Sequence, residues 1–146
     1  MKKLLLLNGP NLNLLGRRET SIYGDLTLDD IVRRCQQFAN ACDFSITNQQ
    51  SNAEHELVDA IHSCITESVV GIVFNPAAFT HTSISLRDAL LAVQIPFVEV
   101  HLSQPLKRES FRHHSYFTDI AIGSVTGFGA DSYLLGLQAM INHIDQ

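Results

Sequence analysis

Three short apolar runs of this sequence each end in side chains that can bind a polar ligand or move a proton. The side chains that follow the runs at 4–7, 69–74 and 97–100 are Asn8, Asn11, Asn75, His81, His101 and Ser103. In an open parallel sheet, ligands bind outside the carboxyl ends of the strands. Amide, imidazole and hydroxyl groups delivered there by strands distant in sequence predict one shared site with acid–base chemistry.

A glutamate and a histidine in the third run form a candidate proton-transfer pair. Glu99 precedes His101 by two residues in an expected strand, so both side chains point to the same face. Glu99 is therefore placed to fix the tautomer of the imidazole or to raise its basicity. His81, which follows the middle run, is a second candidate acid or base.

Tyr23 is a third candidate, because two arginines precede it closely in the chain. A phenol ordinarily stays protonated at neutral pH and is then a poor base. An arginine about 4 Å away, at an effective dielectric near 20, stabilises the phenolate by about 4 kcal/mol. Arg17 and Arg18 are the available cations. The alternative is a tyrosine that only packs within its loop.

Several other chemistries lack their residues. The sequence has no HExxH zinc motif, no GxSxG nucleophile elbow and no GK[ST] phosphate loop. His113 and His114 are adjacent and cannot face one metal together on a regular element, so we expect no metal. A Schiff-base enzyme needs a lysine desolvated in its pocket, but Lys2 and Lys3 begin the first strand and Lys107 lies in a polar loop.

Composition restricts the partners. The chain has 146 residues and a formal charge of −5, whereas nucleic acids require a basic surface, so we expect neither a nucleic-acid nor a membrane partner. No apolar run approaches the roughly 20 residues of a membrane span. Two basic clusters, Arg17–Arg18 and the segment 107–112, fit a small anionic ligand; the alternative is solvated surface charge. Cys35, Cys42 and Cys64 lack CxxC spacing, which predicts buried thiols in a reducing cytoplasm.

Strand and helix patterns alternate along the chain. The expected strands cover 3–8, 44–47, 69–74, 97–101 and 119–124, and the expected helices begin at Thr27, at Asn52 and at 83 and 130. Near-continuous apolar strands separated by helices predict an α/β fold of three layers, with a parallel sheet covered by helices on both faces. The leading topology is flavodoxin-like, with five strands in the order 2-1-3-4-5, in a single catalytic domain over 1–146.

The connection between the first strand and the first helix is unusually long. Such connections usually take two to six residues, whereas this one has about 17. It carries several hydrogen-bonding side chains and has Gly16 and Gly24 as candidate hinges. We expect a mobile lid at about 16–25 that closes over the site; a disordered loop is the alternative.

Four separate motifs resemble type II 3-dehydroquinate dehydratase. They are 12–19 (LNLLGRRE) followed by Tyr23-Gly24, 75–83 (NPAAFTHTS), 99–103 (EVHLS) and 111–115 (FRHHS). The likeness covers essentially the whole chain in order. The chain departs from the family at 104–107 (QPLK), where relatives more often have an Asn-Ile-x-Ala-like stretch, and at Ala77, where many have glycine.

The resemblance implies a hydro-lyase of the shikimate pathway of aromatic amino acid biosynthesis, which converts 3-dehydroquinate to 3-dehydroshikimate and water without a Schiff base. Tyr23, activated by Arg18, would abstract a proton next to the ketone. Asn11 and an ordered water would stabilise the resulting enolate. His101, backed by Glu99, would protonate the departing hydroxyl.

The resemblance also implies how the substrate is held and how the protein assembles. The residues that would hold the hydroxyls and carboxylate are Asn75, His81, Arg112, Leu102 and Ser103. Asp88 would reach into the site of a neighbouring subunit, because the family forms dodecamers built as tetramers of trimers. No metal or organic cofactor would be used, and the enzyme would be cytoplasmic.

Two other functions fit the same fold class. A flavin- or nucleotide-binding protein would want a hydroxyl- and glycine-rich loop after the first strand, whereas this loop reads Asn-Gly-Pro-Asn-Leu-Asn. A receiver-type signalling module would need a phosphorylatable aspartate at the end of the third strand, where this chain has Asn75.

Overall fold

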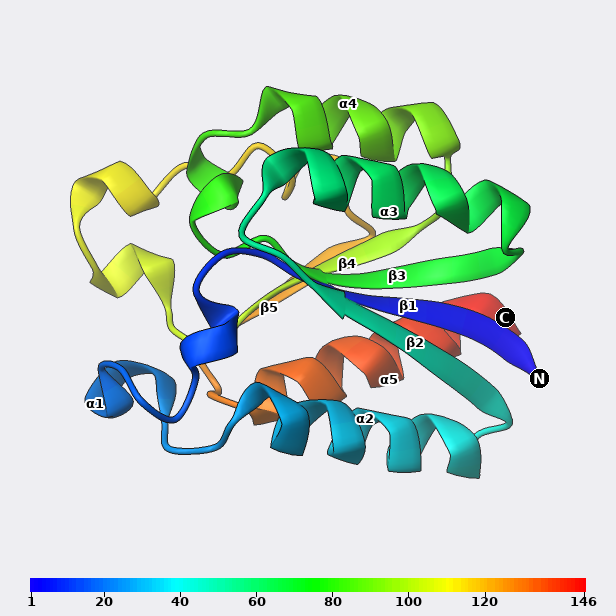
Figure 1. The fold of residues 1–146 in the computed structure, drawn as a ribbon, viewed down its shortest axis with the longest axis horizontal. Helices are drawn as coiled ribbons and strands as arrows, with labels where there is room; N and C mark the ends of the chain where they lie inside the picture. The colour runs from blue at the N-terminus through cyan, green and yellow to red at the C-terminus, as the bar shows by residue number, and fades with distance from the viewer.

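Five parallel strands form one sheet in the order β2-β1-β3-β4-β5, as predicted (Figure 1). The strands are β1 (Lys2–Asn8), β2 (Phe44–Gln50), β3 (Val69–Asn75), β4 (Phe97–His101) and β5 (Gly123–Thr126). The structure, a computed structural model, describes residues 1–146. Under this order β1, β3 and β4 are neighbours, so their carboxyl ends meet at one edge of the sheet.

Helices cover both faces of the sheet and confirm the three-layer α/β fold. Figure 1 shows α2 (Leu28–Ala41) and α5 (Asp131–Asp145) below the sheet, with α3 (Glu54–Thr66) and α4 (Ile84–Val93) above it. The short α1 (Thr20–Tyr23) lies apart from both layers, at the carboxyl end of the sheet. None of the helices combines the length and the apolar character that crossing a membrane would require.

The central strand β1 joins the two cores. Leu4 and Leu6 pack into the apolar cluster between the sheet and helices α2 and α5. Leu5 and Leu7 pack into the cluster between the sheet and helices α3 and α4. Successive side chains of a strand point to opposite faces, so a continuous apolar run fills both layers. Each fully buried leucine contributes about 1.5–3 kcal/mol relative to an exposed one.

Of the first two long helices, α2 begins at the predicted cap residue and α3 does not. The Thr27 cap is confirmed: Thr27 Oγ1 accepts from the Asp30 N–H at 3.2 Å, and Asp30 Oδ2 accepts from the Thr27 N–H at 3.0 Å. The cap predicted at Asn52 is wrong, because α3 starts after Ala53. Asn52 Oδ1 instead accepts from the backbone N–H of Asn11, across 41 residues of chain.

The fifth strand begins later than predicted, at Gly123 rather than at 119. Residues 117–121 form a turn in which the N–H groups of Ile120 and Ala121 both donate to the Phe117 carbonyl oxygen. Asp119 is held outside the sheet by a two-pronged ion pair with Arg87. These contacts remove the start of the apolar segment from the sheet, and pairing with β4 starts where Gly123 faces Val98.

Two of the three cysteines are buried and one is partly exposed. Cys35 and Cys64 lie in the cores, whereas Cys42 is half-buried at the end of α2. Burial raises the pKa of Cys35 to about 12, and burial together with the nearby Glu67 carboxylate raises that of Cys64 to about 11. Both thiols therefore stay protonated and unreactive at neutral pH.

Candidate active site

A cavity of about 140 Å³ opens at the carboxyl ends of β1, β3 and β4. It is lined by all but two of the predicted site residues, namely Asn11, Arg18, Tyr23, Asn75, His81, His101, Leu102, Ser103 and Arg112. Glu99 lies behind His101, and Asp88 lies outside the cavity on α4. The polar side chains that follow the three apolar strands therefore gather at one place.

The loop after β1 reaches the cavity because Gly9 permits close contact with the loop after β3. The Gly9 N–H donates to the Asn75 carbonyl oxygen at 2.8 Å, and a Cβ atom at position 9 would lie 2.3 Å from the Pro76 oxygen. Asn11 follows with a left-handed backbone (φ 68°). Its N–H donates to Asn52 Oδ1, and Asn52 itself does not line the cavity.

His101 and Glu99 form a buried hydrogen-bonded pair. His101 Nε2 lies 2.7 Å from Glu99 Oε2, and Glu99 is only 1% exposed. The same carboxylate accepts hydrogen bonds from three hydroxyl groups, those of Thr80, Ser115 and Thr118. With Nε2 committed to Glu99, Nδ1 is the ring nitrogen left without a partner in the chain.

The environment keeps Glu99 ionised despite its burial. Burial alone would raise the pKa of this carboxyl, but the hydrogen bond and positive charge of His101, with hydrogen bonds from Thr118 and Ser115, hold the pKa below its ordinary value. The carboxylate orients the imidazole through its contact with Nε2, which makes His101 a candidate general acid.

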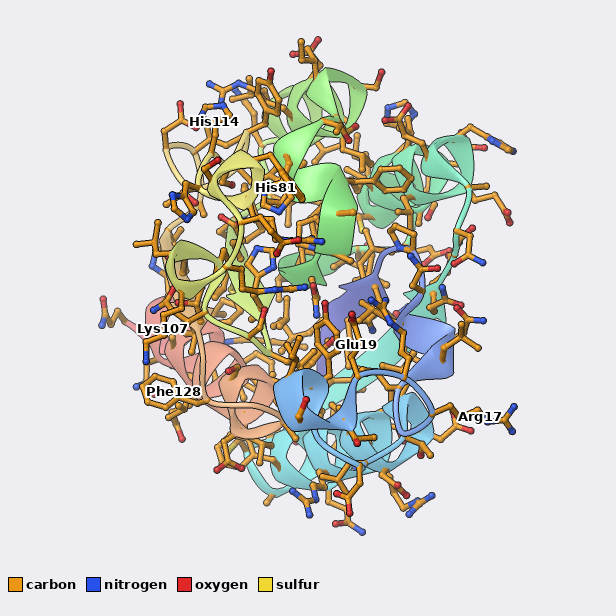
Figure 2. All side chains as sticks on the ribbon, turned by 90° about the vertical axis from the view of Figure 1, so that its left-hand side faces the viewer. Arg17, Glu19, His81, Lys107, His114 and Phe128 are labelled. Atoms are coloured by element: carbon orange, nitrogen blue, oxygen red, sulfur yellow. The ribbon has the colours of Figure 1, made fainter.

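Tyr23 lies between two arginines at the end of α1. Arg108 Nη1 donates to the Tyr23 hydroxyl at 2.8 Å, and Arg18 Cζ lies over the face of the ring, 4.9 Å from its centre. Arg18 also pairs with Glu19 at 2.6 Å. The guanidinium that touches the phenol oxygen thus belongs to Arg108, whereas Arg18 contacts the ring. Figure 2 shows Arg17 pointing away from the molecule.

Arg108 is the functional residue that sequence reasoning missed. The only signal for it was its place in the basic segment 107–112, where nothing distinguishes it from Lys107. In the structure Lys107, the last residue of the short helix Pro105–Lys107, is exposed at the outer edge of the molecule (Figure 2). Arg108 instead lines the cavity and also donates to Ser103 Oγ at 3.3 Å.

Hydrogen-bonding groups line the remaining wall of the cavity. The N–H groups of Leu102 and Ser103 donate to no acceptor within the chain. His81 is oriented by a 2.7 Å contact between its Nδ1 and the His114 carbonyl oxygen (Figure 2), and Arg112 by Glu109 at 3.1 Å. Burial lowers the pKa of His81, against the opposing effect of that hydrogen bond. His81 is therefore neutral at neutral pH and can bind hydroxyl groups.

The cavity is cationic although the protein is acidic overall. Arg18, Arg108 and Arg112 line it, and no aspartate, glutamate or lysine does. An anionic ligand fits this charge, and imine formation lacks its amine. Nowhere in the structure do three or more His, Cys, Asp or Glu side chains gather as a metal site would need.

Ala77 occupies a position that suits glycine. Its backbone is left-handed (φ 53°), a conformation that costs a residue with a Cβ atom about 1–2 kcal/mol. The strain places the Ala77 N–H 3.0 Å from Asn75 Oδ1. Alanine is therefore held here in a backbone conformation that glycine would adopt without this cost.

Comparisons with known proteins agree on one family. The sequence model of the family described as Dehydroquinase class II matches residues 2–141. The chain is 56% identical over 144 residues to the 3-dehydroquinate dehydratase of Tolumonas auensis, covering 99% of this chain and 94% of the relative. It is 57% identical over 142 residues to that of Shewanella woodyi, covering 97% and 93%.

Solved structures give the same result. The type II dehydroquinase of Butyrivibrio crossotus superposes with a TM-score of 0.93 at 37% identity and 97% coverage of both chains. The type II dehydroquinase of Propionibacterium acnes superposes with a TM-score of 0.92, also at 37% identity and 97% coverage of both.

Proposed function

The chain belongs to the class II dehydroquinase family, its activity is that of a 3-dehydroquinate dehydratase, and we propose that Tyr23 and His101 are its base and acid. The observation that carries this assignment is the pairing of opposite electrostatic environments in one cavity. Tyr23 receives a hydrogen bond from a guanidinium, whereas His101 rests on a carboxylate. A guanidinium at the phenol oxygen stabilises a phenolate, and a carboxylate holds the imidazole in position, so the two contacts suit a base and an acid.

Proton abstraction is assigned to the Tyr23 phenolate. Arg108 stabilises the phenolate through the hydrogen bond to its oxygen, and Arg18 through its position over the ring. The proton comes from the carbon next to the ketone, and its bonding electrons pass to the ketone oxygen as an enolate. Asn11, acting through an ordered water, stabilises the enolate, because preorganised dipoles act most strongly away from bulk water.

Loss of water completes the reaction. The enolate electrons re-form the ketone and a carbon–carbon double bond, and the bond to the hydroxyl breaks. His101 supplies a proton to this hydroxyl so that it leaves as water, which gives 3-dehydroshikimate. Glu99 keeps the imidazole oriented for the transfer.

The rest of the cavity holds the substrate. The free N–H groups of Leu102 and Ser103, with the Asn75 amide, are directed at the carboxylate, and His81 and Arg112 at the ring hydroxyls. The segment 16–25, which carries Arg18 and Tyr23, acts as a lid. Gly16 adopts φ 87°, which a residue with a Cβ atom rarely adopts, and is suited to be one hinge.

The working enzyme is a homododecamer arranged as a tetramer of trimers, in which Asp88 completes the site of a neighbouring subunit. Asp88 is exposed and lies outside the cavity of its own chain. Ile84 and Leu91, one turn away on either side along α4, are 56% and 49% exposed. Residues at this spacing share one face of a helix. An apolar face around a carboxylate supports a subunit contact there.

The protein serves the shikimate pathway in the cytoplasm. Its buried, protonated thiols suit a reducing compartment.

Mixing the purified protein with 3-dehydroquinate tests the function. The ultraviolet absorbance of the conjugated enone product should rise without added metal or nucleotide. Borohydride added with substrate should leave the enzyme active, since no imine forms. Absence of enone, or covalent trapping of substrate on Lys107, would refute the proposal.

A further inference from the structure

A chain of buried hydrogen bonds runs behind the cavity from β1 to β3 through α5. The Tyr133 hydroxyl lies 2.6 Å from Asn8 Oδ1 and 2.8 Å from Asn75 Nδ2. Tyr133 is fully buried, and Asn8 and Asn75 are 1% and 2% exposed. Only Asn75 also lines the cavity. The chain therefore connects a wall of the cavity to two residues that do not reach it.

The direction of each hydrogen bond in this chain is determined. The Ala77 N–H can only donate, so it identifies the Asn75 atom beside it, at 3.0 Å, as the carbonyl oxygen Oδ1. The amide nitrogen Nδ2 then faces Tyr133 and donates to its hydroxyl oxygen. A phenol has one hydrogen, and that hydrogen is directed to Asn8 Oδ1.

The phenol keeps its hydrogen at neutral pH. Burial raises the pKa of Tyr133, and the hydrogen bond from Asn75 only partly opposes this effect. The hydroxyl therefore both accepts from Asn75 and donates to Asn8. Because Asn8 takes the phenolic hydrogen, Tyr133 presents a lone pair to Asn75, which only an amide N–H can satisfy.

This arrangement decides which end of the Asn75 amide faces a ligand. One hydrogen of Nδ2 is used by Tyr133, and the other remains for a group in the cavity. A rotated amide would set its oxygen against the phenol lone pair and leave the Ala77 N–H without a partner. An anionic ligand is attracted by the N–H and repelled by the oxygen.

We propose that Tyr133 and Asn8 are positioning residues for substrate binding, which hold the Asn75 amide with its N–H directed at the substrate carboxylate. This inference rests on the proposed function. Neither residue touches the substrate, and both act through Asn75. The interaction is made equally in the ground state and the transition state, so it acts on KM rather than on kcat.

Tyr133→Phe tests this role with little change of shape. We expect the KM for 3-dehydroquinate to rise about tenfold while kcat stays within about threefold of wild type. Met140→Leu is the matched control, because Met140 is equally buried on the same helix and makes no polar contact with the chain. The control should keep the wild-type KM. A KM for Tyr133→Phe equal to that of the control would overturn the proposal.

A double-mutant cycle with Asn75→Ala separates positioning from a general structural effect. If Tyr133 acts through Asn75, adding Tyr133→Phe to Asn75→Ala should raise KM less than about twofold further. If the KM of the double variant rises by the product of the two single-variant effects, the proposal is overturned, because Tyr133 would then act independently of Asn75. Asn8→Leu, which removes the acceptor of the phenolic hydrogen, should also raise KM, and an unchanged KM would equally contradict the inference.

These outcomes differ from a failure of the proposed function. Wild-type protein that forms no enone from 3-dehydroquinate would remove the function itself. An active wild type with an unaltered Tyr133→Phe variant would remove only the positioning role.

Discussion

Replacing Arg108 by methionine isolates the contribution of its charge to proton abstraction. Arg108 Nη1 lies 2.8 Å from the Tyr23 oxygen, and its side chain is only 15% exposed, so water screens the pair weakly. With about 4 Å between the centres of charge and an effective dielectric near 20, the guanidinium stabilises the phenolate by about 4 kcal/mol. Since about 1.4 kcal/mol corresponds to a factor of ten, its full loss would slow the reaction about a thousandfold.

Two neighbouring charges reduce this value. Arg18 stays over the ring in the variant and continues to favour the phenolate. In the wild type Glu109, 3.8 Å from Arg108 Nε, already offsets part of the positive charge. We therefore expect kcat of Arg108→Met to fall by about 30- to 1000-fold.

The assay is the initial rate of enone formation at saturating 3-dehydroquinate, measured across a pH series. Lys107→Met is the control, since it removes the adjacent cation with the same new side chain but from a residue that does not line the cavity. The control should retain wild-type kcat. The reasoning fails if Arg108→Met keeps kcat within about threefold of wild type, or if Lys107→Met loses as much.

Three further variants test other parts of the mechanism. Tyr23→Phe should lose nearly all turnover while its substrate affinity, measured by calorimetry, stays within about tenfold; an active variant would refute Tyr23 as the base. The pKa of Glu99 is lower in the folded protein than the ordinary glutamate value of 4.5, so its negative charge stabilises the fold at any pH above 4.5. This stabilisation is lost as the pH falls through the pKa that Glu99 has in the folded protein. In Glu99→Gln the free energy of unfolding, measured with urea across a pH series, should therefore fall less at acid pH than in the wild type. An equal fall would contradict the assigned pKa direction. Asp88→Ala should raise KM in the assembled enzyme while sedimentation stays unchanged, and an unaltered KM would remove Asp88 from the neighbouring site.

Local patterns were sufficient for most of the fold. The continuous leucines of β1 predicted a strand buried on both faces, and the helix predicted to begin at Thr27 is α2, which Thr27 and Asp30 cap. These features depend on residues one to four positions apart, where strand and helix periodicity act. The apparent start of β5 was wrong because an ion pair from Arg87, 32 residues away, holds Asp119 in a turn.

For the site, the sequence by itself determined which side chains follow β1, β3 and β4 and that Glu99 and His101 share a face. It could not decide which cationic side chain donates to Tyr23, because the four candidates carry the same charge and differ in where the fold places them. These candidates are Arg17, Arg18, Lys107 and Arg108. That choice depends on a contact across 85 residues, and the buried link between Asn8 and Tyr133 spans 125. Such partners are selected by the packing of distant elements, because a hydrogen bond needs atoms about 3 Å apart and no local pattern brings them there.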